Sequence, residues 1–500
     1  MENLNALKAR TAEVVNLNRA ASVLSWDQQT YMPPGGAEAR AEQMATLRKY
    51  SHQVMTADET GRLLEAAEQE VAGLDEHNDE VGLVRIIRRD YDRATKLPSE
   101  HVVEFSKTTT IAHETWVKAR AEDNFALFLP TLEKIYDLCR QRAEYLGYQD
   151  QLYDALLDQY EAGATTAEVE ALFSNLREEL VPFVAAILER ADQVSGEPLH
   201  RAFPADKQAQ FGLMAAQKMG YDMRRGRQDL TVHPFCITFS RDDVRITTRY
   251  DENFLSDGLF STLHEAGHAI YEQGIPARYD GTPLGRGVSL GVHESQSRLW
   301  ENIVGRSRGF WRRFYGELQQ TFAGVLDDVS VEDFYRAINR VSASYIRVDA
   351  DEVTYPLHIM LRFELEQDIF NGKLAVKDAP EAWNAKMEAY LGIRPRNNAE
   401  GVLQDVHWSS GIMGYFPTYA MGTMLSAQLY NAALADHSGI PAEIEQGEFS
   451  TLLQWMNTHV HAYGRKYMPA DVVVKATGQP LQHHAYMNYL RAKFGEIYGL

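Results

Sequence analysis

The stretch at residues 263–270 constrains this chain most, because it sets the order His-Glu-x-x-His within an apolar pattern of helical period. His264 and His268 are four positions apart, so on a helix both imidazoles lie on one face and can reach a single metal ion. Glu265 lies one position round from His264, where its carboxylate can take a proton from water at the metal. The apolar residues of the stretch predict a buried side of this helix: Leu263, Ala266, Ala269 and Ile270.

The same pattern has plainer interpretations. The chain has 16 histidines among 500 residues, and by chance the five-residue pattern arises in about 4 of 100 such chains. A histidine pair on a helix can also be a surface coincidence, or two core histidines with satisfied hydrogen bonds. Support for a metal site therefore has to come from the rest of the chain.

Composition and charge narrow the class of protein. The formal net charge of -20 and the pI near 5.3 argue against a nucleic-acid partner or an anionic membrane surface. The only two cysteines, Cys139 and Cys236, support neither a disulfide framework nor a cysteine-rich zinc site, which favours a reducing compartment. The sequence shows no signal-peptide pattern and no stretch long and apolar enough for a membrane span. We therefore expect a cytoplasmic protein.

Amphipathic patterns of helical period fill most of the chain and predict a mainly α protein. The helices expected before residue 200 cover residues 4–24, 38–50, 79–94, 101–120, 127–146 and 166–194. Those expected after residue 250 cover residues 253–273, 294–304, 310–322, 331–346, 356–370, 382–391, 421–434, 450–463 and 482–497.

One segment breaks the helical pattern. Residues 236–240 and 244–250 are β-branched and alternating around a turn at residues 241–243, which predicts a hairpin directly before the His-Glu-x-x-His helix. We find no internal repeat or flexible linker. We therefore expect one large domain over residues 1–500, with two helical lobes flanking a cleft and a small sheet beside the metal-binding helix.

A catalytic zinc site needs a third protein ligand and keeps one position for water. Glu294 follows His268 by 26 positions and opens a predicted helix, so it is the expected third ligand. His293 is the runner-up, because its side chain would point elsewhere on the same helix. Glu294 could instead be a carboxylate that only stabilises the helix N-terminus.

Peptide hydrolysis also needs a donor for the oxyanion of the tetrahedral intermediate. His407, Tyr415 and Tyr419 lie in aromatic surroundings and are candidates, although ordinary packing explains them equally well.

A peptidase that trims C-termini must bind the terminal carboxylate, for which the arginine fork is well shaped. The candidates are Arg347, which has acidic neighbours, and Arg245 and Arg249 on the hairpin. A structural Arg–Asp pair is the alternative.

Several motifs, in this order along the chain, resemble those of the carboxypeptidase Taq family of zinc metallocarboxypeptidases. They are residues 233–235 (HPF), 243–247 (DVRIT), 264–268 (HEAGH), 293–296 (HESQ), 346–351 (IRVDAD) and 401–408 (GVLQDVHW). The early Trp26-Asp27 and Met32-Pro33 stretches extend the likeness over the full chain. No single motif is decisive, but all of them in order are very specific.

The resemblance implies a mostly helical body with a deep cleft, related to neurolysin-type and angiotensin-converting-type peptidases. It implies a broad-specificity carboxypeptidase that releases single C-terminal residues from peptides with a free C-terminus. Such enzymes bind zinc, often work with cobalt, and are commonly homodimers.

Carried over residue by residue, the resemblance makes His264, His268 and Glu294 the metal ligands and Glu265 the general base and acid. It makes Arg347 and Arg245 candidates for binding the substrate carboxylate or closing the cleft. It makes His407 and Tyr419 candidates for stabilising the oxyanion.

Two rival hypotheses remain open from the sequence. An oligoendopeptidase or a dipeptidyl carboxypeptidase could use the same scaffold, and only an endopeptidase should cleave a C-terminally amidated peptide normally. A non-catalytic helical protein with a structural metal would need a fourth protein ligand, and none is evident next to Glu294.

Overall fold

The computed structural model describes all residues from 1 to 500, and the chain folds into two compact units. Unit 1 is built from Met1–Thr95, Gly196–Ile338 and Leu429–Gln479. Unit 2 is built from Lys96–Ser195, Asn339–Gln428 and Pro480–Leu500. The predicted arrangement of two lobes around a cleft stays a prediction.

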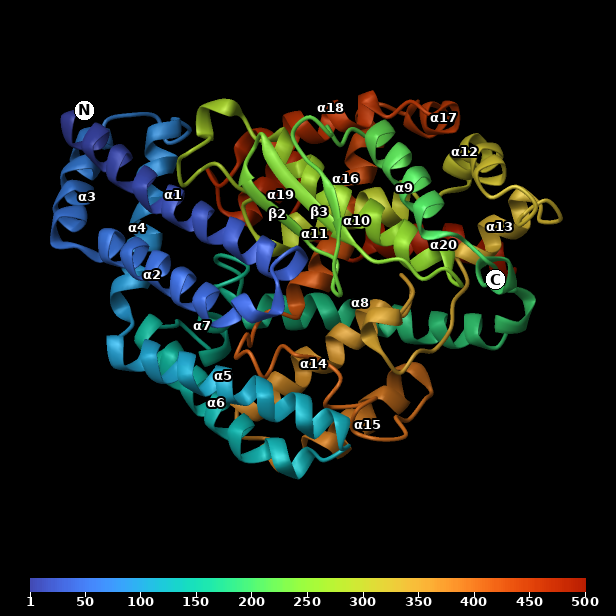
Figure 1. Ribbon diagram of the computed structural model, residues 1–500, viewed down its shortest axis with the longest axis horizontal. Coiled ribbons are helices and arrows are strands. Elements are labelled where there is room, and N and C mark those ends of the chain that lie inside the picture. Colours follow the sequence, from blue (N-terminus) through green and yellow to red (C-terminus); the bar gives the residue numbers. More distant parts are fainter. The chain divides into compact units, whose positions relative to one another are not determined.

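Unit 1 holds the N-terminal helices, the sheet and the His-Glu-x-x-His helix (Figure 1). Its first helices are α1 (Glu2–Thr30), α2 (Ala37–Thr56), α3 (Asp58–Val71) and α4 (Asp79–Lys96), whose last residue belongs to unit 2. Its central helices are α9 (Ala205–Met219), α10 (Leu255–Gly274), α11 (Leu290–Arg298), α12 (Arg308–Thr321) and α13 (Val331–Ile338). Its last helices are α17 (Ile440–Gln446), α18 (Ser450–His459) and α19 (Pro469–Thr477).

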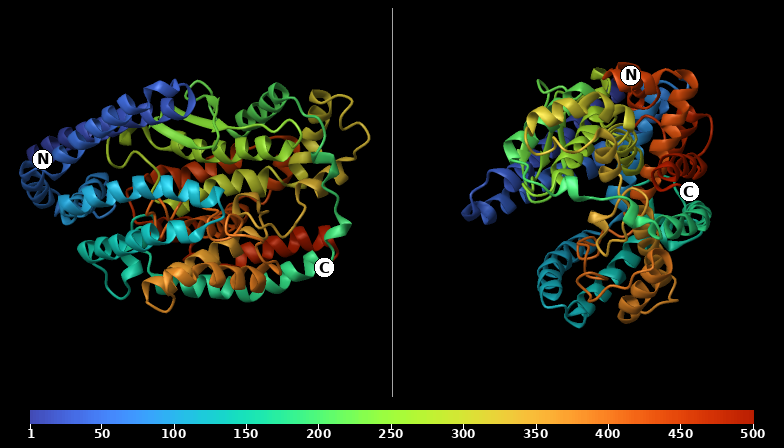
Figure 2. Two further views of the ribbon diagram at one scale, coloured as in Figure 1. Left: turned by 60° about the horizontal axis from the view of Figure 1, so that its bottom comes forward. Right: turned by 90° about the vertical axis from the view of Figure 1, so that its right-hand side faces the viewer.

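Helices are the main regular elements of unit 2, and its helices α5 and α6 run side by side in the views of Figures 1 and 2. Its helices are α5 (Ser99–Ala121), α6 (Phe125–Leu146), α7 (Leu152–Leu157), α8 (Thr166–Leu188), α14 (Tyr355–Phe370), α15 (Ala379–Leu391) and α20 (His484–Tyr498). Helix α16 (Pro417–Asp436) begins in unit 2, and its residues from Leu429 onward belong to unit 1.

The sheet has three strands, β1 (Gln228–Leu230), β2 (Cys236–Ser240) and β3 (Asp243–Thr248), in the order β1-β3-β2. The predicted hairpin is confirmed as the antiparallel pair β2–β3, in which Cys236 faces Ile246. Strand β1 pairs with β3 in parallel and was not predicted, because three residues are too few to show alternation.

The mainly α class is confirmed, but several predicted ends were wrong. Helix α1 continues through residues 25–27 to Thr30, whereas α13 ends at Ile338, well short of the predicted residue 346. Helix α8 begins where the sequence suggests, because Thr165 and Glu168 form a capping box in which each side chain accepts the other's backbone N–H.

Helix α10 occupies the core of unit 1. Fourteen of its 20 residues are buried, including the predicted apolar side with Leu263, Ala266 and Ala269 fully enclosed. A helix buried on nearly all sides needs cover all round, and here α9, α11, β2 and β3 pack against it. The small sheet therefore lies beside the His-Glu-x-x-His helix, as predicted (Figure 1).

Candidate active site

The three residues predicted to bind a metal come together in unit 1. His264 and His268 lie on α10 and Glu294 lies on α11, and their potential ligand atoms are all within 4.8 Å of one another. The Nε2 atoms of both histidines are 3.5 Å from the same Glu294 oxygen, Oε2. Two imidazole nitrogens and one carboxylate oxygen converging on one point form a His₂Glu donor set, which suits zinc.

A glycine allows the two ligand helices to approach this closely. A Cβ atom on Gly267 would lie 2.7 Å from the carbonyl oxygen of Gln296 and 2.7 Å from the Cα of Ser297, both on α11. The close approach brings Glu294 opposite the histidine pair. Helix α11 itself begins at a capped end, where the Ser289 hydroxyl accepts the backbone N–H of Val292 at 3.2 Å.

Arg298, one turn after Glu294, orients the predicted carboxylate ligand. Its Nε donates to Glu294 Oε1 at 2.7 Å, while Ser297 donates to Oε2 at 3.0 Å. Burial by itself raises the pKa of Glu294, but the charges of Arg298 and His264 outweigh it and hold that pKa well below its usual range. Glu294 is therefore a carboxylate with Oε2 turned toward the histidines.

Glu301 contacts His264 through the ring nitrogen Nδ1, which is not the nitrogen nearest Glu294. It lies on a π-helical segment, Leu299–Val304, and its Oε2 is 2.9 Å from Nδ1 of His264. Arg298 and Arg306 also donate to Glu301, at 3.2 and 3.3 Å. Burial opposes ionisation of Glu301, yet Arg298 and His264 lower its pKa to about 2. Nδ1–H of His264 is thus directed to a carboxylate, which leaves Nε2 for a metal.

The second histidine has a different neighbour. His268 Nδ1 is 2.6 Å from Nδ1 of His293, and His293 Nε2 is 2.9 Å from Oε1 of Glu272. Burial and the neighbouring His293 lower the pKa of His268 to about 3. For His264, burial also lowers the pKa, but the charge of Glu294 and the bond to Glu301 reverse the direction and raise it. The pKa values of the two histidines therefore shift in opposite directions because His264 lies near carboxylates and His268 lies near another histidine.

Glu265, the predicted proton acceptor, is buried beside the triad with 7% of its surface exposed. Burial raises the pKa of Glu265 to about 7, although the neighbouring His264 pulls it down. A carboxyl group with a pKa near 7 can both accept and return a proton at neutral pH.

The thiol of Cys236 on β2, a residue of intermediate exposure, shares this environment. Its pKa is raised well above the usual value, first by burial and then by the charges of Glu265 and Glu272. The group therefore stays a thiol at neutral pH, and metal ligation by cysteine needs the thiolate.

The remaining predicted residues of unit 2 form a cluster of their own around Asp405. Arg347 is buried, and its Nε and the Nε of Arg362 each donate to one oxygen of Asp405, at 2.9 and 2.7 Å. Arg347 also donates to Tyr355 and, through its backbone N–H, to Gln404. Burial raises the pKa of Asp405, but the two guanidinium groups outweigh it and lower that pKa far below its usual range.

His407 and Tyr419 lie together in unit 2. His407 Nε2 is 3.3 Å from the Tyr419 hydroxyl, and the ring of Tyr415 is 5.5 Å from that of His407. Burial lowers the pKa of His407 to about 3, so its imidazole is neutral at neutral pH. A neutral imidazole and a phenol are both able to donate a hydrogen bond, which is what the predicted oxyanion role requires.

The two hairpin arginines are engaged with nearby carboxylates. Arg245 donates through Nε and a terminal nitrogen to both oxygens of Asp243, each at 2.8 Å, and its guanidinium lies over Trp26 and Phe239, 4.4 and 4.8 Å from the ring centroids. Arg249 pairs with Asp257 at 2.9 Å.

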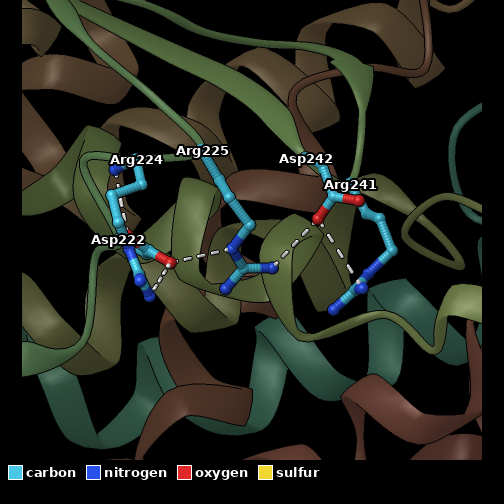
Figure 3. A pocket seen from close by; sticks show the side chains of 5 residues that line it. All are labelled: Asp222, Arg224, Arg225, Arg241 and Asp242. Carbon is cyan, nitrogen blue, oxygen red and sulfur yellow. Dashed lines mark hydrogen bonds and ion pairs between the residues drawn. The ribbon is translucent and has the colours of Figure 1, made fainter.

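A pocket of about 470 Å³ in unit 1 carries charged residues outside this site (Figure 3). Arg225 lies between Asp222 and Asp242, at 3.1 and 3.6 Å, and Arg241 pairs with the same Asp242 (Figure 3). The lining therefore consists of three arginines and two aspartates that pair with one another.

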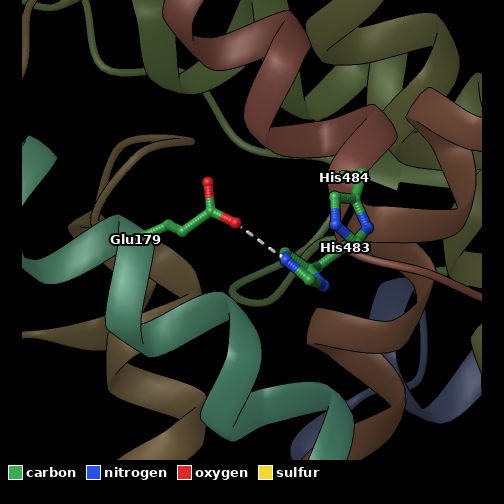
Figure 4. Close-up of side chains that lie close together, drawn as sticks. All are labelled: Glu179, His483 and His484. Atoms are coloured by element: carbon green, nitrogen blue, oxygen red, sulfur yellow. Dashed lines mark hydrogen bonds and ion pairs between the residues drawn. The ribbon is translucent and has the colours of Figure 1, made fainter.

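A second group of possible metal ligands lies in unit 2 (Figure 4). Glu179 Oε1 accepts a hydrogen bond from His483 Nε2 at 2.9 Å, with His484 beside it (Figure 4). Oε2 of Glu179 pairs with Arg491 at 2.7 Å. Both carboxylate oxygens are therefore already engaged by partners on α20 or at its start.

Sequence reasoning did not find Arg298, Glu301, Glu272 or Cys236. Two of them carried a usable signal, because Arg298 follows Glu294 by four positions and Glu272 follows His268 by four, the spacing of neighbours on one helical face. Glu301 had no such signal, since a π-helical turn shifts the side chains away from the α-helical spacing.

A survey of the helices for long apolar windows finds none able to span a membrane.

Comparison with known proteins covers the whole chain. The family described as carboxypeptidase Taq (M32) metallopeptidase matches residues 6–494. Thermostable carboxypeptidase 1 of Thermus thermophilus is 43% identical over 100% of this chain and 99% of its own length, and carboxypeptidase 1 of Bacillus subtilis is 39% identical over 97% and 96%.

Solved structures give the same result. The M32 carboxypeptidase of Deinococcus radiodurans R1 superposes with a TM-score of 0.97 at 43% identity, covering 100% of both chains. The carboxypeptidase of Pyrococcus furiosus has a TM-score of 0.95 at 39% identity, covering 99% of both chains. These matches show that the chain, in which the predicted ligands converge in unit 1, is a peptide hydrolase. It belongs to the carboxypeptidase Taq (M32) family of metallopeptidases.

Proposed function

We propose that this protein is a zinc-dependent carboxypeptidase that removes single C-terminal residues from peptides with broad specificity. The observation that carries the proposal is the convergence of His264, His268 and Glu294, with both imidazole Nε2 atoms 3.5 Å from one carboxylate oxygen. Three protein ligands are the number found in catalytic zinc sites, which keep the fourth position for water or substrate, whereas structural sites have four.

The residues around the triad fit a divalent cation. Glu301 engages His264 Nδ1, so the Nε2 atom can be a ligand. Arg298 engages Glu294 Oε1, so Oε2 is the oxygen on the histidine side. A bound zinc ion would lower the pKa of water to about 7 and polarise the substrate carbonyl.

Glu265 is the general base and acid of the proposed reaction. Its pKa of about 7 lets the carboxylate accept a proton from the attacking water and return it to the amine of the departing residue. Burial keeps bulk water from competing for the proton, and the neighbouring His264 favours the ionised form.

His407 and Tyr419 are proposed to donate to the oxyanion, and Arg347 to act in recognition of the substrate carboxylate. The family motifs support these roles, and so does the chemistry of the residues. His407 is neutral and lies beside the Tyr419 hydroxyl. The Arg347 guanidinium is held in place by hydrogen bonds to Asp405 and Tyr355. Arg245 stays a proposed substrate residue on the motif alone.

The resemblance also supports two further proposals: cobalt can replace zinc, and the protein is a homodimer. The cysteine content supports a third, that the protein acts in the cytoplasm, where its two unpaired cysteines would remain reduced.

Mass spectrometry of an N-terminally blocked peptide tests the proposed activity. The protein is incubated with the peptide after chelation and again after zinc or cobalt is restored. We expect a ladder shortened one residue at a time from the C-terminus, lost on chelation, and no cleavage of the C-terminally amidated peptide. Dipeptide steps would indicate a dipeptidyl carboxypeptidase, and cleavage of the amidated peptide an endopeptidase. No cleavage with metal bound would contradict catalysis.

A further inference from the structure

We propose that His293 and Glu272 are positioning residues of the metal centre. Glu272 sets the tautomer of His293, and His293 in turn holds His268 with its Nε2 lone pair available to the metal. The inference rests on the proposed metal binding by His264, His268 and Glu294.

Three side chains form a continuous chain of contacts behind the triad. Nδ1 of His268 is 2.6 Å from Nδ1 of His293, and Nε2 of His293 is 2.9 Å from Oε1 of Glu272. His268 and Glu272 are four positions apart on α10, whereas His293 comes from α11. The ring from α11 therefore bridges two successive turns of the His-Glu-x-x-His helix.

The donors and acceptors along this chain allow one order of protons when a metal is bound. A carboxylate oxygen only accepts, so Nε2 of His293 carries the hydrogen that it donates to Glu272. A neutral His293 then has a lone pair on Nδ1, which accepts Nδ1–H of His268. His268 is left with a lone pair on Nε2, the atom 3.5 Å from Glu294 Oε2. The reverse order would put a hydrogen on Nε2 of His268 and block its use as a ligand.

The surroundings of Glu272 and His293 keep both side chains in place. Glu272 is 5% exposed, and its Oε1 also accepts the backbone N–H of Gly287 at 3.0 Å. A Cβ atom on Gly287 would lie 2.7 Å from Cδ2 of His293 and 2.9 Å from the ring of Tyr271. The absence of a side chain at Gly287 thus makes room for the imidazole that the carboxylate orients.

This arrangement distinguishes the two histidine ligands. His264 meets the carboxylate of Glu301 directly, at 2.9 Å, whereas His268 reaches the carboxylate of Glu272 only through a second imidazole. A ligating histidine usually gives its other N–H to such a partner, and loss of the partner typically weakens metal binding 10- to 100-fold. His293, the runner-up ligand of the sequence analysis, thereby takes a supporting role.

Matched substitutions separate tautomer control from simple packing. Glu272→Leu and His293→Leu remove the acceptor, while Glu272→Gln keeps an acceptor oxygen and His293→Asn keeps one near the position of Nδ1. His461→Leu is the control for packing, because His461 is also fully buried, lies against the Tyr271 ring, and bonds to Gln296 on α11 at 2.9 Å without touching a predicted ligand.

The measurements are the zinc affinity of each variant, by competition with a fluorescent chelator, and the visible spectrum of the cobalt-loaded protein. We expect the two leucine variants of the chain to bind zinc about 10- to 100-fold more weakly than the wild type and to show an altered cobalt spectrum. Glu272→Gln, His293→Asn and His461→Leu should stay within about threefold of the wild type, which is clearly less than the 10- to 100-fold loss expected for a missing partner.

Three results would overturn the inference: wild-type affinity in both leucine variants, equal losses in Glu272→Gln and Glu272→Leu, or an equal loss in His461→Leu. The His264→Ala variant tests the proposed metal site itself. If its zinc affinity is unchanged, the metal site is elsewhere and the proposed function fails together with the inference. If only His264→Ala loses affinity, the metal site stands and the positioning role fails.

Discussion

Burial decides what the Glu265 carboxyl group can do. The side chain sits next to two ion-paired carboxylates, Glu294 and Glu301, whose pKa values are strongly lowered, yet its own pKa is raised to about 7. Burial is the largest influence on all three carboxyl groups, but Arg298 and His264 outweigh it at Glu294 and Glu301, whereas His264 does not outweigh it at Glu265. Carboxylates whose pKa values are pushed apart in this way can take different roles in one site.

The Glu265→Gln substitution separates proton transfer from metal binding. We expect the variant to keep its zinc, because the three predicted ligands and their carboxylate partners are unchanged. The turnover number should fall about 10²- to 10⁴-fold, the usual contribution of a general base. Zinc content by elemental analysis and initial rates on a blocked peptide measure the two effects. A variant that is inactive because it has lost its metal would contradict this division of roles.

Arg245 offers a second residue at which packing and function can be separated. Its guanidinium pairs with Asp243 and lies over the rings of Trp26 and Phe239, so it joins α1 to the hairpin. Lysine keeps the charge but loses the two-pronged pairing and the flat contact with the rings.

We expect Arg245→Lys to lower the free energy of unfolding by about 1 kcal/mol, the scale of a partly exposed cation–π contact. The KM for a peptide substrate should rise as well, because Arg245 is also a proposed substrate residue and lysine cannot pair with a carboxylate in the same two-pronged way. Urea unfolding and steady-state kinetics provide both numbers. A loss of stability at unchanged KM would contradict the substrate-carboxylate role implied by the family motif.

At the scale of elements, the distance between α10 and α11 controls the site. Two predicted ligands lie on one helix and the third on the other, and a Cβ atom on Gly267 would lie only 2.7 Å from the backbone of α11. The π-helical segment that follows α11 then turns Glu301 toward His264. Such segments recur at functional sites because they redirect side chains within a helix.

Gly267→Ala tests this spacing. The added methyl group would meet the backbone of α11 at 2.7 Å, and backbone cannot move aside as a flexible side chain can. We expect a loss of about 1–3 kcal/mol in the free energy of unfolding, as for other overpacked sites, together with weaker zinc binding.

Gly316→Ala is the matched control for Gly267→Ala. It places the same methyl group inside α12, where nothing lies within 4 Å, and should raise stability by about 0.5–1 kcal/mol through helix propensity alone. Thermal unfolding with and without chelator compares the two variants. Equal effects of the two substitutions would show that the close approach at Gly267 is not a constraint.

At the scale of the whole molecule, each unit buries its own set of charged groups. Unit 2 encloses Glu366, which accepts hydrogen bonds from Tyr153, Trp408 and the backbone of Gly414 at 2.6–3.0 Å. Burial outweighs these donors and raises the pKa of Glu366 from 4.5 to about 7. The folded protein therefore holds a proton on this group more tightly than the unfolded chain does.

The raised pKa of Glu366 makes stability depend on pH. Its contribution is fully present below pH 4.5 and is lost as the pH rises through 7, with a total effect on the order of 3 kcal/mol. Glu366→Gln stays neutral at every pH but replaces one of the two acceptor oxygens with an NH₂ group, so its stability relative to the wild type should be higher at pH 8 than at pH 5. Urea unfolding at the two pH values measures this difference. A variant whose stability relative to the wild type is the same at both would contradict the shift.

The sequence by itself determined the fold class and the pattern of the His-Glu-x-x-His helix. Periodicity predicted most of the long helices because an amphipathic pattern reflects one buried face, and the hairpin because its strands alternate. The His-Glu-x-x-His spacing placed His264 and His268 on one face, since four positions are close to one helical turn. Local spacing cannot tell which distant segment packs against that face, so Glu294 and His293 remained rival third ligands.

Only the tertiary structure showed where these side chains lie relative to one another. It set Glu294 Oε2 opposite both imidazoles, placed His293 behind His268, and supplied Arg298, Glu301 and Glu272 as their partners. It also enclosed Glu265 and thereby raised its pKa. These properties depend on burial and on contacts between α10, α11 and the π-helical segment, which form only when the chain is packed. Helical periodicity is a local property and can be read from neighbouring residues, whereas desolvation and hydrogen-bond partners belong to the folded whole.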